Sequence, residues 1–428
     1  MSETGILLFV VFIILIFMGV PVSVALGSTA LFFIWKLNLG VQVFSTSFYA
    51  GIAKFQLLAI PFFILAGMIL ERCGISKRLV NLASLLIGRI PGGLAIVAIA
   101  VCVFFGGISG SGPADAAALG AVLIPAMAAK GYDKPFAAAL IAAAGSTAII
   151  IPPSIGLIIY GAITTVSIPA LFAAGILPGI IAGLSLVIPA VVISIYKSYP
   201  SERWGRLREI SAAFKDSFWG LVAPFIILGG IYTGIFTPTE AAVVAVFYGL
   251  FVGIFIYKTF DISMLYQTMV DASVSSAVVM LIVAMAGIFS WAGSTMGVMD
   301  RGAEMLLSLK TSPVVILLMI NLMLLIAGMF FDAISIYYVF LPILIPVMQH
   351  YNWDPVWFGI MMTVNLAIGQ FTPPVAVNLF VTTNLAGIPL EKTSYASLPF
   401  IAAMVLGLII IILFPWLSLF LPKLWHLV

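Results

Sequence analysis

Apolar runs long enough to cross a lipid bilayer recur from residue 5 to residue 421, and glycine and proline interrupt several of them near the middle. Of the 428 residues, 63% are hydrophobic and only 8% are charged. An unpaired backbone N–H or C=O group in hydrocarbon costs several kcal/mol, so the runs must be helical, and each interruption must lie inside protein or beside a polar cavity. The sequence therefore predicts an all-α polytopic membrane protein with discontinuous helices.

The clearest interruption is the stretch from Gly106 to Asp115, which holds four glycines, a proline, two serines and an aspartate. A helix cannot continue through this composition. Because apolar segments flank it on both sides, we predict that it is the tip of a re-entrant helical hairpin over residues 93–129. The alternative is a kink that serves helix packing.

The rest of the chain divides around a charged segment near its midpoint. Residues 5–36 form two short crossings or one kinked crossing, and the mixed composition of residues 39–55 predicts an interfacial helix. The basic residues and spaced aromatics of residues 197–219 predict an amphipathic surface helix, with a solvated connector as the alternative. The predicted organisation is a first repeat over residues 1–196 (hairpin 93–129, broken helix 136–161), a linker over 197–219, and a second repeat over 220–428 (hairpin 313–349, broken helix 355–384).

An internal repeat supports this division. A shift of 221 residues places the glycines, prolines and aspartates of the first half on those of the second half, without a gap. The matching positions are Gly107 and Gly328, Pro125 and Pro346, Met127 and Met348, Asp133 and Asp354, and the double prolines Pro152-Pro153 and Pro373-Pro374. Each half therefore holds a broken hairpin, a polar turn and a crossing that is broken at a double proline.

The distribution of basic residues predicts that the second repeat is inverted. With an odd number of crossings in each half, thirteen of the 18 Lys and Arg residues fall on one face, which the positive-inside rule makes cytoplasmic. Lys36, Lys54, Arg301, Lys310 and Lys423 fall on the outer face, and no basic residue is expected at the midplane. The two hairpins then enter from opposite sides and meet near the midplane, which is the plan of a secondary transporter with inverted-topology repeats.

Unwound backbone and hydroxyl groups supply hard oxygen ligands, which suit Na⁺. The sequence therefore predicts two cation sites, one where each hairpin tip meets a broken helix. The first site comprises Ser109, Ser111, Gly145, Thr147 and Pro152. The second comprises Gly328, Gly369, Thr372 and Val375, mostly through their backbone carbonyls.

An anionic solute would be held without basic side chains, by hydroxyls, helix N-termini and bound cations. Asp332 aligns with Ser111, and as an intramembrane carboxylate it either supports a cation or holds its hairpin. Asp115 and Glu240 are helix caps or substrate contacts, and Asn378 either contacts substrate or bonds across helices. The candidate substrate contacts are Ser109, Gly110, Ser111, Ser154, Asp332, Thr372 and Asn378.

Several protein classes lack support in the sequence. There is no Walker lysine motif, so ATP does not drive this chain directly and no cofactor is expected beyond Na⁺ as the coupling ion. Each Na⁺ that moves inward through 100 mV contributes about 2.3 kcal/mol. Residues 1–4 hold no basic residue, so no cleaved signal peptide is expected. Cys73 and Cys102 lack metal-ligand spacing, and the net charge of +3 does not suggest nucleic acid.

At these residues the chain resembles the large membrane subunit of the tripartite ATP-independent periplasmic (TRAP) transporters, over essentially its whole length. The nearest resemblance is to sialic-acid members. The segments that carry the resemblance are Gly107–Asp115, Ile150–Ser154, Gly234–Ala242 and Gly369–Pro374.

The resemblance implies a Na⁺-coupled importer of the bacterial inner membrane that takes up a carboxylate-bearing solute, with sialic acid as the best guess. It implies a periplasmic substrate-binding protein and a small four-helix membrane subunit as partners. It also implies an elevator mechanism, in which a transport domain that holds the hairpins and broken helices slides against a scaffold.

Three other functions fit parts of the pattern. Gly107-Ile108-Ser109-Gly110 fits the Gly-x-Ser-Gly pattern of rhomboid intramembrane proteases, but the only two histidines, His350 and His426, are expected far from that serine. A channel usually builds its pore from symmetric subunits, which two inverted hairpins in one chain do not resemble. A proton-coupled carrier of C4-dicarboxylates or other organic anions would use Asp332 as its proton carrier, and this alternative stays open.

Overall fold

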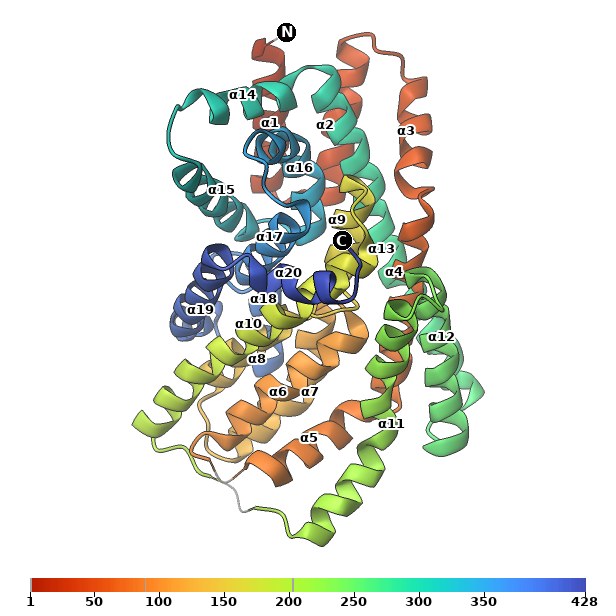
Figure 1. Cartoon of the computed structure of the whole chain (residues 1–428), viewed down its shortest axis with the longest axis vertical. Helices are drawn as coiled ribbons and strands as arrows, with labels where there is room; N and C mark the ends of the chain where they lie inside the picture. The colour runs from red at the N-terminus through yellow and green to blue at the C-terminus, as the bar shows by residue number, and fades with distance from the viewer. Residues whose placement is uncertain (1, 89, 202–203) are drawn as a thin grey trace.

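The computed structural model describes residues 2–88, 90–201 and 204–428, and the regular structure in these ranges is helical (Figure 1). Eight of the described helices are long and apolar enough to span a bilayer. Arg89 and Arg203, two of the thirteen basic residues counted above, lie outside the described residues, as does Glu202 of the predicted linker. The chain is an all-α polytopic membrane protein, as predicted.

The helices of the first half begin with a separated pair, because Gly19-Val20-Pro21 divides residues 5–36 into two helices rather than one kinked helix. In chain order they are α1 (Ser2–Phe17), α2 (Val22–Lys36), α3 (Gln42–Ile52), the 3-10 turn η1 (Phe55–Leu58), α4 (Ala59–Arg72), α5 (Ile75–Ile87), α6 (Gly93–Ser109), α7 (Gly112–Ala129), α8 (Lys134–Ser146), the 3-10 turn η2 (Thr147–Ile149), α9 (Ile155–Thr164) and α10 (Ile168–Tyr196).

The second half follows the same plan with longer helices at its start. Its helices are α11 (Leu207–Tyr232), α12 (Pro238–Phe251), the π-helical turn η3 (Val252–Ile256), α13 (Ile262–Thr295), α14 (Val298–Ser308), α15 (Pro313–Gly328), α16 (Ala333–His350), α17 (Pro355–Gly369), α18 (Val377–Ala386), α19 (Leu390–Leu413) and α20 (Trp416–Leu424).

The shift of 221 residues relates the helices of the two halves. It carries Gly112, the first residue of α7, onto Ala333, the first residue of α16. Both double-proline peptide bonds, Pro152-Pro153 and Pro373-Pro374, are cis. Figure 1 shows the α6–α7 pair below the centre of the molecule and the α15–α16 pair above it. The hairpins of the two repeats therefore approach the centre from opposite sides, as the charge distribution predicted.

The first helix of each broken crossing forms the centre of the core. All described side chains of α8 from Phe136 to Ser146 are buried, and so are those of α17 from Val356 to Gly369. Alanine and glycine dominate α8, and small residues let neighbouring membrane helices approach closely. The ends of these two helices, where the breaks begin, are therefore enclosed by protein and not by lipid.

Residues 39–55 do not form the interfacial helix that their composition predicted. Both α3 and α4 pack against the 34-residue helix α13, and Figure 1 shows them end to end along it. Gly51 lies against α13, since an added Cβ there would be in ordinary van der Waals contact with the Cα of Ala284, at 3.7 Å. Lys54 consequently lies in the break between α3 and η1. The expectation that every basic residue lies near one of the two membrane faces is wrong for Lys54.

The predicted linker, residues 197–219, has no structural boundary at residue 219. Residues 207–219 are the first half of α11, which continues to Tyr232 without interruption. This half packs on α5, where Arg78 Nε donates to Asp216 Oδ1 at 3.0 Å. Residues 197–219 therefore do not form a separate surface helix, because residues 207–219 are the start of a longer helix and the preceding Lys197, Trp204 and Arg206 lie outside it.

Candidate functional site

Each repeat places the tip of its hairpin against the break of its discontinuous helix. We refer to residues 109–112 as the first tip and residues 145–154 as the first break. Residues 328–332 are the second tip and residues 369–376 are the second break. These four segments contain nearly all the residues that the sequence nominated for cations and solute.

The first tip contacts the first break through backbone, at positions where only glycine fits. Gly110 has a φ of +64°, and a Cβ added there would lie 2.3 Å from the carbonyl oxygen of Pro153. The backbone N–H of Ile155 donates to the carbonyl of Gly110 at 3.3 Å. A Cβ on Gly145 would lie 3.1 Å from the backbone nitrogen of Ala116. Backbone carbonyls of the break therefore face the tip directly.

The hydroxyls of this region lie on the same backbone segments. Ser154 Oγ donates to the carbonyl of Ile149 at 2.5 Å and accepts the N–H of Leu157 at 3.2 Å. Thr147 Oγ1 donates to the carbonyl of Ala144 at 2.7 Å. The Thr147 hydroxyl uses its hydrogen in this way, so its oxygen lone pairs remain available as ligands.

Asp115 is fully buried beside the first tip, and it does not cap α7. Ser109 Oγ donates to Asp115 Oδ1, and the N–H of Ser111 donates back to Ser109 Oγ at 3.3 Å. The second carboxylate oxygen, Oδ2, is buried without a hydrogen-bond partner among the described residues. Ser109 thus links the tip to a buried carboxylate. The sequence indicated a helix cap or a substrate contact for Asp115 and did not predict this bond.

The second tip also contacts the second break through backbone, here between two glycines. A Cβ on Gly369 would lie 2.6 Å from the Cα of Gly328, and a Cβ on Gly328 would lie 2.9 Å from the Cα of Gly369. The N–H of Val375 donates to the carbonyl of Met329 at 3.3 Å. Thr372 Oγ1 donates to the carbonyl of Ile368 at 2.6 Å. The polar atoms that these bonds place at the second tip and break are backbone groups and one hydroxyl.

Asp332 caps α16 at the second tip. Its Oδ2 accepts the N–H groups of Ile334 at 2.9 Å and Ser335 at 3.1 Å, and its Oδ1 accepts the Ser335 hydroxyl at 2.5 Å. The carboxylate therefore holds the start of the second hairpin helix, where the positive end of the helix dipole favours an anion.

The two repeats meet crosswise at these breaks. A Cβ on Gly112 of the first tip would lie 2.2 Å from Gln370 Oε1 of the second break. Asn378 is fully buried, and its Nδ2 donates to the carbonyl of Ala142 on α8 at 3.3 Å. In the described part of the chain, the buried amide oxygens of Gln370 and Asn378 have no hydrogen-bond partner. Buried acceptor oxygens therefore lie between the two repeats.

The structure places the remaining candidates as follows. Glu240 forms a capping box with Thr237, whose N–H donates to Glu240 Oε2 at 2.8 Å, and this lies at the start of α12 and not at a tip. The predicted cation and solute residues other than Asn378 all lie on the tips or breaks. Asn378 lies on α18 next to the second break. Among the described residues, no group of three or more His, Cys, Asp or Glu side chains is placed to hold a metal ion.

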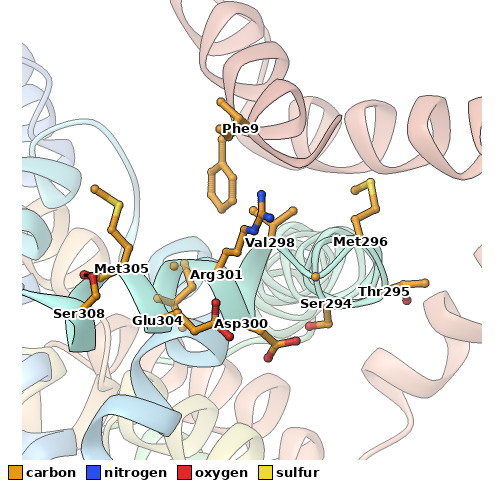
Figure 2. A pocket seen from close by; sticks show the side chains of 14 residues that line it. Phe9, Ser294, Thr295, Met296, Val298, Asp300, Arg301, Glu304, Met305 and Ser308 are labelled. Carbon is orange, nitrogen blue, oxygen red and sulfur yellow. Dashed lines mark hydrogen bonds between the residues drawn. The ribbon is translucent and has the colours of Figure 1, made fainter. Parts of the chain in front are cut away.

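A cavity of about 1040 Å³ lies away from the tips, at the end of α13 and between α1 and α14. Figure 2 shows Arg301 of α14 extending toward Phe9 of α1, with Asp300 and Glu304 on the same helix. The charge distribution assigned Arg301 to the outer face. This cavity is therefore a candidate contact surface on that face and is separate from the tips.

The family of the chain follows from comparison with known proteins. Residues 9–417 match the family model described as "Tripartite ATP-independent periplasmic transporter, DctM component". The chain therefore belongs to this family, which is a family of transporter components and not of enzymes. It is a multi-pass protein of the bacterial inner membrane, and the intramembrane protease alternative is excluded.

Curated relatives carry names with different solutes. The chain is 42% identical over 96% of its length to the isethionate TRAP transporter permease protein DctMQ of Oleidesulfovibrio alaskensis, and spans 65% of that protein. It is 38% identical to the C4-dicarboxylate TRAP transporter large permease protein DctM of Vibrio cholerae, covering 98% of this chain and 97% of that one. It is 36% identical to the sialic acid TRAP transporter large permease protein SiaM of Vibrio cholerae, covering 96% of both.

A solved structure shares the fold. The YdaH transporter of Alcanivorax borkumensis, whose crystal structure was described as revealing an unusual topology, matches 89% of this chain and 90% of its own with a TM-score of 0.65. The sequence identity is 16%, so this likeness concerns the fold alone.

Proposed function

We propose that this chain carries a small organic anion and Na⁺ together into the cell, as the large membrane subunit of a TRAP transporter. The observation that supports this most is the meeting of two inverted hairpin tips with two oxygen-rich helix breaks at the centre of the molecule. Inverted repeats with discontinuous helices are the architecture of secondary transporters, and their solute and ion sites lie at such breaks.

Sodium is the proposed coupling ion because the donor atoms at both breaks are neutral oxygens. The first site would use Ser109, Ser111, Gly145, Thr147 and Pro152. The second would use Gly328, Gly369, Thr372 and Val375. Hard cations prefer such oxygen ligands, and two bound Na⁺ ions would compensate the charge of an anionic solute beside them.

The solute class is proposed from the relatives and from the site together. Relatives named for isethionate, C4-dicarboxylates and sialic acid are similar to this chain to nearly the same degree, so the resemblance to sialic-acid members does not select one solute. The Ser111 hydroxyl and the backbone of Gly110 would contact the anionic group, and the hydroxyls of Ser109 and Ser154 would do so by turning their hydrogens away from Asp115 and the Ile149 carbonyl. A periplasmic binding protein would deliver the solute, and a small four-helix membrane subunit would support the chain in the membrane.

The proposed motion is an elevator movement. The moving body would comprise the hairpins and broken helices, α6 to α9 and α15 to α18, whose breaks pack on one another. The stationary body would comprise α1 to α4 and α11 to α13. This division is supported by the long helix α13, which packs on α2, α3 and α4.

Reconstitution in liposomes tests the proposal. The chain, with its small subunit and binding protein, is given an inward Na⁺ gradient and labelled sialic acid, a C4-dicarboxylate or isethionate. We expect uptake of one of these solutes with Na⁺ outside, and none when K⁺ replaces Na⁺. Uptake that follows a pH gradient in the absence of Na⁺ would overturn the sodium assignment in favour of proton coupling.

Asp332 distinguishes the two coupling ions directly. We expect the Asp332→Asn variant to take up solute within about threefold of the wild-type rate and with unchanged Na⁺ dependence, since Asn and Asp are equally good N-cap residues. The measurement is the initial uptake rate as a function of Na⁺ concentration and of pH. If Asp332 carried a proton, the variant would lose coupled uptake, and the sodium proposal would fail.

A further inference from the structure

Lys54 is a positive charge within the transmembrane region, away from both faces. At one end of the helix pair, Arg72 of α4 forms an ion pair with Asp271 of α13. Gly51 lies opposite Ala284, about 20 Å further along α13 at 1.5 Å per residue. The whole of α13 has 34 residues and is about 50 Å long. Lys54 therefore lies near the middle of the longest membrane helix.

The hydrogen-bond partner of this ammonium group is a helix end on the opposite body. Lys54 Nζ donates to the carbonyl of Ala162, in the last turn of α9, at 2.7 Å. Within the described ranges no carboxylate forms an ion pair with Lys54. The C-terminal carbonyls of a helix attract cations, but they carry only a partial charge. Lys54 is exposed and not enclosed by the protein, but a lysine at membrane depth that lacks a carboxylate partner is by default a candidate functional residue.

A cavity of about 290 Å³ adjoins Lys54 between the two bodies. Its polar lining includes Ser47 near Lys54, Ser290 and Trp291 of α13, and Tyr338 of α16. The Tyr338 side chain is only 6% exposed, and its hydroxyl has no hydrogen-bond partner in the ranges that the structure describes. A buried hydroxyl that lacks a partner is rare, and here it borders a cavity that also contains an ammonium group.

Gly51 and Gly287 both line this cavity. A Cβ added to Gly287 would make ordinary van der Waals contacts, with the Cα of Gly51 at 3.8 Å and with the ring of Tyr338 at 3.9 Å. The volume lies at the small end of the range for ligand pockets, which begins at about 300 Å³. It suits an organic acid of a few carbon atoms, or the anionic end of a larger one.

The cavity lies about two helical turns from the first break and from the second tip. Ala162 lies eight residues after Ser154 of the first break, and Tyr338 lies six residues after Asp332 of the second tip, so each is roughly 10 Å along its helix from the proposed solute site. Both helices run from the breaks and tips toward the end of the molecule that holds α14 (Figure 1). A solute that enters from that end passes this cavity before it reaches the tips.

We propose that Lys54 binds the carboxylate or sulfonate group of the entering solute in this cavity, as an outer binding site distinct from the tips. The anion would take the place of the Ala162 carbonyl at Nζ and would accept a hydrogen bond from the Tyr338 hydroxyl. This inference rests on the proposed import of an organic anion. It predicts that the cavity attracts anions even in the absence of transport, so anion attraction can be tested on its own.

Cysteine labelling tests the electrostatic part without transport. Ser290→Cys is placed in the chain and treated with two methanethiosulfonate reagents of similar size, one bearing a sulfonate and one a trimethylammonium group. The native Cys73 and Cys102 are both buried, and the unsubstituted chain is the control for their reaction. We expect the anionic reagent to react faster with Lys54 present, and the ratio of the two rates to fall at least tenfold in the Lys54→Gln background. Lys54→Arg should restore it.

Protection by a probe anion completes the test. Succinate and isethionate, each at millimolar concentration, should slow labelling of Ser290→Cys when Lys54 is present and should not slow it in Lys54→Gln. In the uptake assay, Lys54→Gln should raise KM about tenfold and leave the maximal rate within twofold. An unchanged reagent ratio together with absent protection would overturn the outer site. Protection without any uptake would overturn the proposed function and leave the outer site in place.

Discussion

Replacing Gly110 with alanine is expected to reduce uptake at least 100-fold, the largest effect of any single substitution proposed for this chain. The φ of +64° costs an alanine about 1 kcal/mol or more, and its Cβ would lie 2.3 Å from the carbonyl oxygen of Pro153. The tip must therefore move away from the break. A displacement of about 1 Å at a site of this kind can reduce a rate by about 10²-fold. Initial uptake rates in proteoliposomes measure the loss.

Gly387→Ala is the matched control for this prediction. Gly387 has a φ of +63°, nearly the same as that of Gly110, but nothing lies within 4 Å of an added Cβ. It therefore carries the backbone strain of the first substitution without the clash. We expect this variant to be slightly less stable and to transport normally. Equal loss of uptake in both variants would mean that backbone strain alone is responsible, and the proposed contact between the first tip and the first break would lose its support.

Gly369→Ala is expected to weaken Na⁺ binding at the second site alone. The backbones of Gly369 and Gly328 are so close that an added Cβ would lie 2.6 Å from the Cα of Gly328. Overpacking of this kind typically costs about 1–3 kcal/mol, which, if it falls on the Na⁺-bound state, corresponds to a decrease in Na⁺ affinity of roughly 5- to 150-fold. The measurement is the Na⁺ concentration that gives half-maximal uptake, together with the steepness of its Na⁺ dependence.

Gly229→Ala provides the comparison, because Gly229 lies within α11 and a Cβ there would meet nothing within 4 Å. Alanine also favours the helix relative to glycine by up to about 1 kcal/mol. We expect unchanged Na⁺ dependence in this variant. A normal Na⁺ dependence in Gly369→Ala would remove the second break from the proposed cation sites.

The hairpins and breaks were predictable because they violate the pattern around them. Glycine and proline inside apolar runs are costly, so their recurrence at a spacing of 221 residues is enough to indicate two related discontinuities. The bounds of α6 and α7, Gly93–Ser109 and Gly112–Ala129, coincide with the predicted first hairpin. Glycine and proline interruptions are local features of the sequence, so they can be recognised in a single sequence without knowledge of the tertiary structure.

Contacts between distant segments were not predictable in the same way. Lys54 was assigned to the outer face by the count of crossings, with residues 39–55 taken as an interfacial helix. Only the packing of α3 on α13 reveals that this helix runs along α13. The Ser109–Asp115 bond was missed for a similar reason. The spacing of six residues crosses a turn at Gly110, whose geometry brings the two side chains together.

The sequence by itself determined that this is a polytopic helical protein with two repeats, two broken hairpins and two double-proline breaks, because hydrocarbon forces every apolar run into helix and leaves interruptions only where protein encloses them. Tertiary structure alone decided which residues of the two repeats and of distant helices face one another: Gln370 against Gly112, and Lys54 against the end of α9. Periodicity records which face of a helix is apolar, but in a chain that is apolar on nearly every face it cannot record which neighbour each face contacts.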